Sequence, residues 1–225
     1  MHCMLLKKQC KACSKNNRKK VLGSPVSGSE PYQARLFFRS FLPPWYSIRM
    51  QWIAVGLGNP DKEYVGTRHN IGKDLLASLK DKLPKGVKAH ELNVYMNSSG
   101  GPIKKLITSK KAAEKLIVLH DELDLPLGRI KVSFGSSAGG HNGVRSIESA
   151  LKTKDYVRIR IGVSGATPSG KLKRPAPEKI TDFVLGKFKP AEAEKIKKVK
   201  KLVEEALELV VTESVERAQT EMNAR

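Results

Sequence analysis

The sequence predicts a single α/β domain, in which helices flank a twisted, mixed sheet that is largely parallel. Apolar segments typical of strands alternate along the chain with segments whose apolar residues recur at helical spacing. The chain has 225 residues, which is enough to bury one sizeable core. We expect the domain to span residues 51–225 and to follow a basic extension at residues 1–50.

The first half of the domain is expected to contain two strands and a helix between them. Residues 52–57 (WIAVGL) are apolar and lead into a glycine turn, which indicates a buried strand. Four leucines then recur at helical spacing from Leu75 to Leu83. Residues 116–120 (LIVLH) form a short apolar run that predicts a second buried strand.

The second half is expected to add two strands and two helices. Residues 130–134 and 157–163 alternate apolar and polar side chains, as half-buried strands do. A helix face with Val144 follows a glycine-rich segment, and residues 196–210 predict a long amphipathic helix. We interpret its lysine-rich stretch, residues 195–211 (KIKKVKKLVEEALELVV), as a solvated face, with an RNA-contacting surface as the alternative.

The charge of the chain favours a polyanionic partner. Lysine and arginine number 42 against 22 acidic residues, which gives a formal charge of +20, and +11 of this belongs to residues 51–225. Nucleic acid is the first candidate and an anionic membrane surface the second, while a basic surface without a partner stays open. No apolar run approaches the roughly 18 residues of a membrane span, so we expect no membrane-spanning segment.

Residues 1–50 differ in composition from the rest of the chain. They hold ten basic residues and a single acidic one, Glu30, which is typical of a mitochondrial presequence. On this ground we expect a mitochondrial protein, with the cytoplasm as the second choice. The alternative interpretations of the segment are a disordered basic tail and a start codon placed too early. All three cysteines lie here, and the spacing of Cys3, Cys10 and Cys13 is irregular for zinc. We expect no metal and no cofactor.

Three polar, glycine-rich segments stand at the ends of predicted strands, where α/β proteins bind ligands. They are residues 56–72, 120–128 and 135–143. The first fails as a dinucleotide fingerprint, because Asp61 occupies the position of the third glycine. The third matches a nucleophile elbow around Ser137, but the histidine that follows, His141, is too close to be the separate partner of a catalytic triad.

The remaining polar residues suit ester hydrolysis by an activated water. A histidine can remove a proton from water near neutral pH, and a carboxylate on its other ring nitrogen can fix its tautomer. Asparagine amides can hold a carbonyl group or a ribose hydroxyl. From spacing alone, His69 is as consistent with a structural role as with that of a base.

Several blocks of the sequence resemble the bacterial-type peptidyl-tRNA hydrolase family. They are GLGNPDKEYVGTRHNIG (residues 56–72), YMNSSG (95–100) and HDELDLPLGRIKVSFGSSAGGHNGVRSI (120–147), followed by weaker blocks at 158–163, 182–188 and 215–223. The resemblance covers residues 52–225 in order. It implies hydrolysis of the ester between a peptide and the 3′-terminal ribose of tRNA, which recycles tRNA from stalled translation, with peptidyl-tRNA as partner.

The resemblance also implies roles for individual residues. His69 would be the general base, Asp121 would orient it, and Asn59 and Asn97 would place the ester and the water. The other substrate or tRNA contacts that it implies are at Tyr64, Tyr95, Met96, Asn142 and Lys131. Where the family has a second basic residue, this chain has Ser133. We expect Asp124 to cap a loop, and His120 and His141 to have structural roles or to support the catalytic residues from behind.

One departure from the family lies between residues 73 and 93. Only 27 residues separate His69 from Asn97, whereas the family has a longer stretch that supplies strands. We therefore expect a smaller sheet with an exposed edge and reduced stability, or a variant chain. The alternative function is a tRNA-binding member of the same fold with impaired catalysis. A different enzyme of this fold, associated with tRNA or with splicing, and a serine esterase are further alternatives. We expect a monomer.

Overall fold

A mixed sheet organises the computed structural model, which describes residues 51–225. Its strand order is β2-β1-β3-β5-β4, and β6 pairs with β5. The strands are β1 (Trp52–Gly56), β2 (Val87–His90), β3 (Leu116–Pro126), β4 (Ile130–Phe134), β5 (Val157–Ala166) and β6 (Leu172–Lys173). The first four strands in this order are parallel, whereas β4 and β6 run antiparallel to β5. The largely parallel, mixed sheet that the sequence predicts is confirmed.

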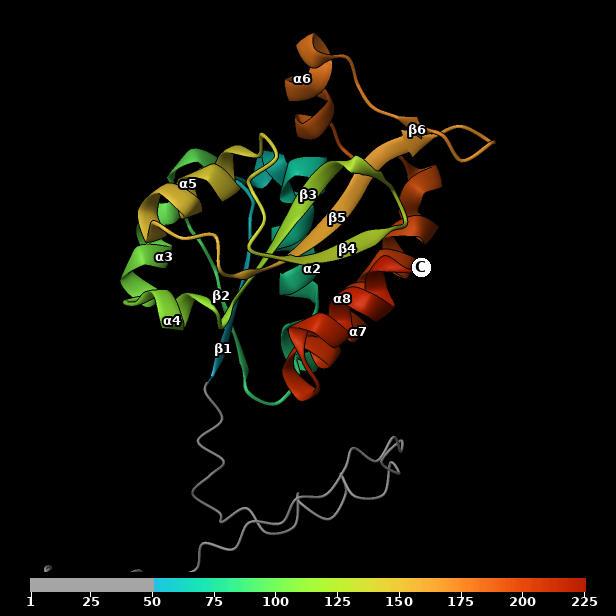
Figure 1. Ribbon diagram of the computed structural model, residues 1–225. Coiled ribbons are helices and arrows are strands. Elements are labelled where there is room, and N and C mark those ends of the chain that lie inside the picture. The colour runs from blue at the N-terminus through green and yellow to red at the C-terminus, as the bar shows by residue number, and fades with distance from the viewer. Residues whose placement is uncertain (1–50) are drawn as a thin grey trace, which may run out of the picture. The chain divides into compact units, whose positions relative to one another are not determined.

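Helices cover both faces of this sheet (Figure 1). One face packs against α2 (Ile71–Ser78), α7 (Ala193–Thr212) and α8 (Val215–Asn223), and the other against α3 (Gly100–Leu106) and α5 (Asn142–Leu151). The shorter helices are α4 (Lys110–Ala113), α6 (Ile180–Leu185), and the 3-10 turns η3 (Lys62–Tyr64), η4 (Arg68–Asn70), η5 (Lys80–Lys82), η6 (Met96–Ser98), η7 (Pro177–Lys179) and η8 (Pro190–Glu192). In the described part of the chain, every helix is too short or too polar to cross a membrane.

The alternation of side chains along β3 produces two hydrophobic cores. Ile117 and Leu119 face α2 and α7, while Leu116 and Val118 face α3 and α5. All four side chains are fully buried. Burial of each such side chain contributes about 1.5–3 kcal/mol, so the sheet is held firmly from both sides and its strand ends are fixed in space.

Two elements differ in length from the sequence prediction. The predicted helix through Leu83 ends instead at Ser78 and is followed by η5. Pro84 disfavours helical backbone at the residue before it, and Leu83 is indeed extended with ψ at 140°. Strand β3 is longer than predicted and runs to Pro126, because β5 continues beside it as far as the pairing of Pro126 with Ser164.

The shortened segment between residues 73 and 93 supplies the edge strand β2. This strand pairs with β1 through Trp52 and Val87, and no described strand lies on its other side. Val87 and Ala89 pack partly buried against the core, whereas Lys88 is exposed. A lysine on an edge strand opposes pairing with a second chain. Reduced stability relative to longer relatives stays a prediction.

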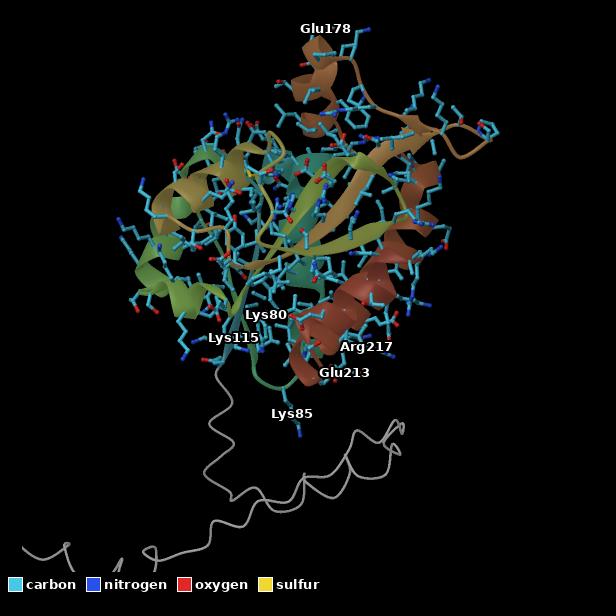
Figure 2. All side chains as sticks on the ribbon, in the orientation of Figure 1. Lys80, Lys85, Lys115, Glu178, Glu213 and Arg217 are labelled. Carbon is cyan, nitrogen blue, oxygen red and sulfur yellow. The ribbon has the colours of Figure 1, made fainter. Side chains whose placement is uncertain are left out.

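Labelled charged residues mark the two ends of the domain in the figures. Figure 2 shows Lys115, Glu213 and Arg217 at the end where β1 begins, and Glu178 at the opposite end, beside α6. The carboxyl ends of the parallel strands point towards α6 (Figure 1).

The predicted targeting segment and the cysteine motif fall in residues 1–50, outside the described residues.

Candidate active site

A cavity of about 400 Å³ opens at the carboxyl ends of β1 and β3. Its walls come from the turn after β1, η4, η6, β3, the glycine-rich loop before α5, and α6. Seven residues that the sequence singles out line it: Asn59, His69, Tyr95, Met96, Asn97, Asp121 and Asn142. Tyr64 on η3 and Lys131 on β4 do not line it. The volume is ordinary for a small-ligand site.

Close glycine packing brings His69 to the sheet. His69 lies in η4, directly before α2, and α2 crosses β3 at Gly72. A Cβ atom on Gly72 would lie 2.3 Å from the carbonyl oxygen of Leu119, which no real side chain tolerates. Because Gly72 has no side chain, α2 can approach β3 closely enough for His69 to reach the residues that follow Leu119.

Asp121 is the acceptor at the centre of the site. The Nδ1 atom of His69 and the Nε2 atom of His141 each lie 2.9 Å from the same carboxylate oxygen, Oδ1. Burial alone would raise the pKa of Asp121, but the attraction and the hydrogen bonds of the two histidines outweigh it and hold the pKa well below its usual range. Asp121 is therefore ionised at neutral pH and accepts a hydrogen bond from each ring.

The contacts around Asp121 assign the ring protons. The Nδ1 atom of His141, the N-cap of α5, accepts the backbone N–H of Val144 at 3.3 Å, so its proton is on Nε2, facing Asp121. His69 donates from Nδ1, which leaves its Nε2 atom unprotonated in the neutral ring. That atom has no hydrogen-bond partner among the described residues, and the His69 side chain is 14% exposed. A lone pair on Nε2 is what a general base needs.

His120 is buried beside this pair. Its Nδ1 atom donates to the backbone carbonyl of Asp121 at 2.7 Å, and its ring contacts that of His141 edge-on at 4.8 Å between centroids. Burial lowers the pKa of His120 well below its usual value, and the positive charge of Arg158 lowers it further. His120 is therefore neutral and supports the site structurally, as the sequence predicts.

Hydrogen bonds fix the side chain of Asn59 in one orientation. Its Oδ1 atom accepts the backbone N–H of Met96 at 2.9 Å, so its Nδ2 atom must be the end that is left over. Asn70 holds the backbone of Asn59 on both sides, through bonds of 2.9 and 3.0 Å. Asn59 thus offers an oriented N–H donor at the cavity wall.

Asn142 is held in a similar way at the mouth of the cavity. Arg145 donates from Nη2 to the Oδ1 atom of Asn142 at 2.6 Å, so the amide NH2 group remains for a ligand. Asn97 and Asn142 also line an adjoining groove of about 680 Å³ between η6 and α5. Across the entrance, the Tyr95 hydroxyl donates to Asp61 at 2.6 Å and links the turn after β1 to η6.

His69, Asp121 and His141 are also the residues that could hold a metal ion. One ligand atom from each lies within 4.8 Å of the others. However, both ring nitrogens that face Asp121 carry protons in the hydrogen-bonded arrangement, and a metal ion would need their lone pairs. The donor set therefore suits a general base held by a carboxylate better than a metal centre.

Comparison with known proteins identifies the family. The sequence model of the peptidyl-tRNA hydrolase family matches residues 53–93 and 86–225. A peptidyl-tRNA hydrolase of Mycobacterium tuberculosis is 37% identical over 195 residues, which cover 76% of this chain and 97% of the relative. The chain belongs to the peptidyl-tRNA hydrolase family. A second relative, from Pseudarthrobacter chlorophenolicus, is 34% identical over 190 residues, which cover 75% of this chain and 93% of that protein.

Solved structures of peptidyl-tRNA hydrolases share the fold. The enzyme from Acinetobacter baumannii superimposes with a TM-score of 0.65 at 29% identity, over 78% of this chain and 96% of that one. The match to the family breaks into two segments that overlap at residues 86–93. This break falls within the shortened segment, where the sequence departs from the pattern of the peptidyl-tRNA hydrolases.

Some residues of the site were not expected from the sequence. Asn70 and Arg145 orient the two asparagines, and α6 contributes Ile180 and Leu185 to the cavity wall. Contacts between such distant segments leave no signal in spacing. Only the proximity of Asn70 to His69 in the chain could have drawn attention to it.

Proposed function

We propose that the protein hydrolyses the ester bond between the peptide and the 3′-terminal ribose of peptidyl-tRNA. The shared oxygen of Asp121 is the observation that carries this proposal. It fixes the His69 tautomer in which Nε2, inside the cavity, is free to accept a proton. Family membership supports the substrate, and the +11 charge of residues 51–225 suits its phosphate backbone.

The reaction follows from this geometry in two steps. His69 Nε2 removes a proton from a water molecule as its oxygen attacks the ester carbonyl carbon, which creates a tetrahedral oxyanion and an imidazolium ring. The intermediate then collapses, the bond to the ribose oxygen breaks, and the imidazolium returns its proton to that oxygen. The products are tRNA and the peptide carboxylic acid, which then releases its remaining proton to solvent and becomes a carboxylate, and Asp121 remains ionised throughout.

The oriented asparagines serve as donors in this scheme. The NH2 group of Asn59 faces the cavity because its carbonyl end is bound to Met96, so it can donate to the ester carbonyl and to the oxyanion that forms from it. Asn97 and Asn142 stand at the junction with the adjoining groove and can hold the ribose or the peptide. Loss of one preorganised donor typically slows such reactions by about 10²–10³-fold.

The test is release of N-acetyl amino acid from N-acetyl-aminoacyl-tRNA by the purified protein, without added metal. We expect turnover by the wild type and by Ser137→Ala, which removes the hydroxyl of the apparent nucleophile elbow. Loss of activity in Ser137→Ala would favour a serine esterase. Binding of the substrate without turnover would favour the alternative of a tRNA-binding protein with impaired catalysis. In that alternative, the shortened segment that supplies β2 is the cause of the impairment.

The cellular setting of this activity is a separate proposal. The acid-poor, basic composition of residues 1–50 supports delivery to mitochondria, with the cytoplasm as the alternative. We further propose that the protein acts as a monomer, since Asn59, His69 and Asp121 of a single chain already meet in one cavity. Imaging of the full chain fused to a fluorescent protein, with and without residues 1–50, tests the first proposal, and sedimentation tests the second.

A further inference from the structure

Five lysines gather on the first half of α7. We call Lys195, Lys197, Lys198, Lys200 and Lys201 the α7 lysine cluster; four of them are exposed, and Lys200 is half-exposed. Lys197 pairs with Glu194 at 2.7 Å. The other four have no charged partner among the described residues. The cluster therefore presents unneutralised positive charge to the solvent.

The order of charges along α7 is not the one that stabilises a helix. Lys195 lies in the first turn, where the helix dipole favours acidic residues, and the last turn holds no basic residue, although the dipole would favour one there. Lysines three and four residues apart also repel one another. Packing needs only the buried stripe that includes Val199 and Val203. Neither helix stability nor packing explains the cluster.

The cluster lies close to the segment that carries Arg68 and His69. Glu192, directly before α7, forms an ion pair of 2.9 Å with Arg68, the neighbour of His69. Because a helix rises about 1.5 Å per residue, the whole cluster lies within about 15 Å of Glu192 along the helix axis. The ion pair ties this end of α7 to the cavity, so a large ligand held at His69 can also reach the cluster.

Further cations connect the cluster to the edge of the sheet. Lys195 packs beside Gly128, and Lys198 borders a small cavity with Arg129 at the turn before β4. Lys131 follows on β4 with its side chain exposed. Figure 1 shows α7 running behind this edge strand. Positive charge thus extends from α7 around β4 to the opposite face of the sheet.

We propose that the α7 lysine cluster, together with Arg129, binds the ribose-phosphate backbone of the base-paired part of tRNA while the cavity holds its esterified end. This inference rests on the proposed function. A duplex presents phosphates at regular intervals on a surface far larger than the cavity, and each cation that meets a phosphate releases a counterion. The cluster recognises charge and not sequence, so it suits a substrate that varies in sequence.

The alternative polyanion, an anionic membrane, fits the cluster less well. A helix that binds a membrane surface places apolar side chains in the lipid, but the apolar stripe of α7 is buried in the core. Glu208 is exposed on the same helix and would face the same lipid plane. A curved RNA stem can contact the lysines and avoid the glutamates.

The test compares two triple variants with the same change of charge. The first, Lys195→Gln with Lys198→Gln and Lys201→Gln, removes charge from the cluster. The control, Lys105→Gln with Lys110→Gln and Lys111→Gln, removes it from α3 and α4 on the other face of the sheet. Both are assayed for binding of full-length tRNA as a function of salt, and for hydrolysis of N-acetyl-aminoacyl-tRNA and of a CCA trinucleotide with the same ester.

We expect the cluster variant to flatten the slope of log affinity against log salt by about 2–3, which corresponds to two or three lost phosphate contacts, and the control by less than 1. Hydrolysis of the trinucleotide ester should stay at the wild-type rate in both. Equal losses in the two variants, or an unchanged slope in the cluster variant, would overturn the proposal. So would loss of binding to phosphatidylserine vesicles with tRNA binding intact. A wild type that binds tRNA but hydrolyses neither ester would refute the proposed function alone, because the binding slopes still decide the role of the cluster.

Discussion

Replacing Asp121 by asparagine separates the charge of this residue from its hydrogen bonds. Both histidine rings donate to a single oxygen, Oδ1, at 2.9 Å. An asparagine can place its carbonyl oxygen at that point, because the reverse orientation would set its NH2 group against two N–H donors. The variant Asp121→Asn therefore keeps the tautomers of His69 and His141 and loses only the negative charge.

The effect of this loss on the rate follows from the separation of the charges. When His69 takes the proton of the water, an imidazolium forms with its charge about 4 Å from that of the carboxylate, where two unit charges attract by about 4 kcal/mol at an effective dielectric constant of about 20. Since 1.4 kcal/mol corresponds to a factor of ten, we expect Asp121→Asn to slow hydrolysis about 10³-fold. Affinity for tRNA should not change, because His69 is still neutral when tRNA binds and the carboxylate charge acts only on the imidazolium that forms afterwards.

Single-turnover hydrolysis of N-acetyl-aminoacyl-tRNA, with enzyme in excess, measures the effect. Asp121→Ala serves as the comparison, because it removes both the charge and the shared acceptor and should be slower still. The affinity of each variant for tRNA is measured in parallel. If Asp121→Asn stays within about threefold of the wild type, the carboxylate charge does not stabilise the imidazolium and the reasoning fails. If the two variants are equally slow, the acceptor adds nothing beyond the charge.

Three further predictions concern packing, pH and salt. Gly72→Ala places a Cβ 2.3 Å from the Leu119 carbonyl oxygen, so urea denaturation should show a loss of about 1–3 kcal/mol, and the wild-type free energy would contradict the close approach. His120→Asn should flatten the pH dependence of stability, because burial lowers the pKa of His120 in the folded protein and only the unfolded chain takes up the extra proton. The wild type should therefore lose about 1.4 kcal/mol of unfolding free energy per pH unit below roughly pH 6.5. Equal slopes of unfolding free energy against pH in the two proteins would refute the linkage. Lys131→Ala should reduce the salt dependence of tRNA binding by about 0.7–0.9 in log-log slope, and an unchanged slope would mean that Lys131 contacts no phosphate.

The sheet was predictable because its strands are buried on both faces. The runs at 52–57 and 116–119 are apolar throughout, which is typical of a central parallel strand, and the alternation of strands with helices indicates a largely parallel sheet. Strand β2 was not predictable from its own residues, since Val87, Lys88, Ala89 and His90 form a short edge strand without a strong apolar pattern. Only its pairing with β1 gives it the extended form.

The sequence singles out seven residues that line the cavity, but not the hydrogen bonds that connect them. Motif resemblance singles out His69 and Asp121, and the structure brings them into contact across 52 residues of chain. The sharing of one carboxylate oxygen by His69 and His141 depends on how α5 begins beside β3, which no local pattern records. The same holds for the orientation of Asn59, which a backbone N–H far along the chain determines.

The activity of His69→Ala is the most direct test of the account, because the central claim is that Nε2 of this residue activates water. The matched control is His90→Ala, which removes a histidine on β2 outside the cavity. We predict that His69→Ala slows single-turnover hydrolysis of N-acetyl-aminoacyl-tRNA by about 10²–10⁴-fold, the usual effect of losing a general base, while its affinity for tRNA and the rate of the control stay at wild-type values. A His69→Ala variant that hydrolyses the ester at the wild-type rate would contradict the claim.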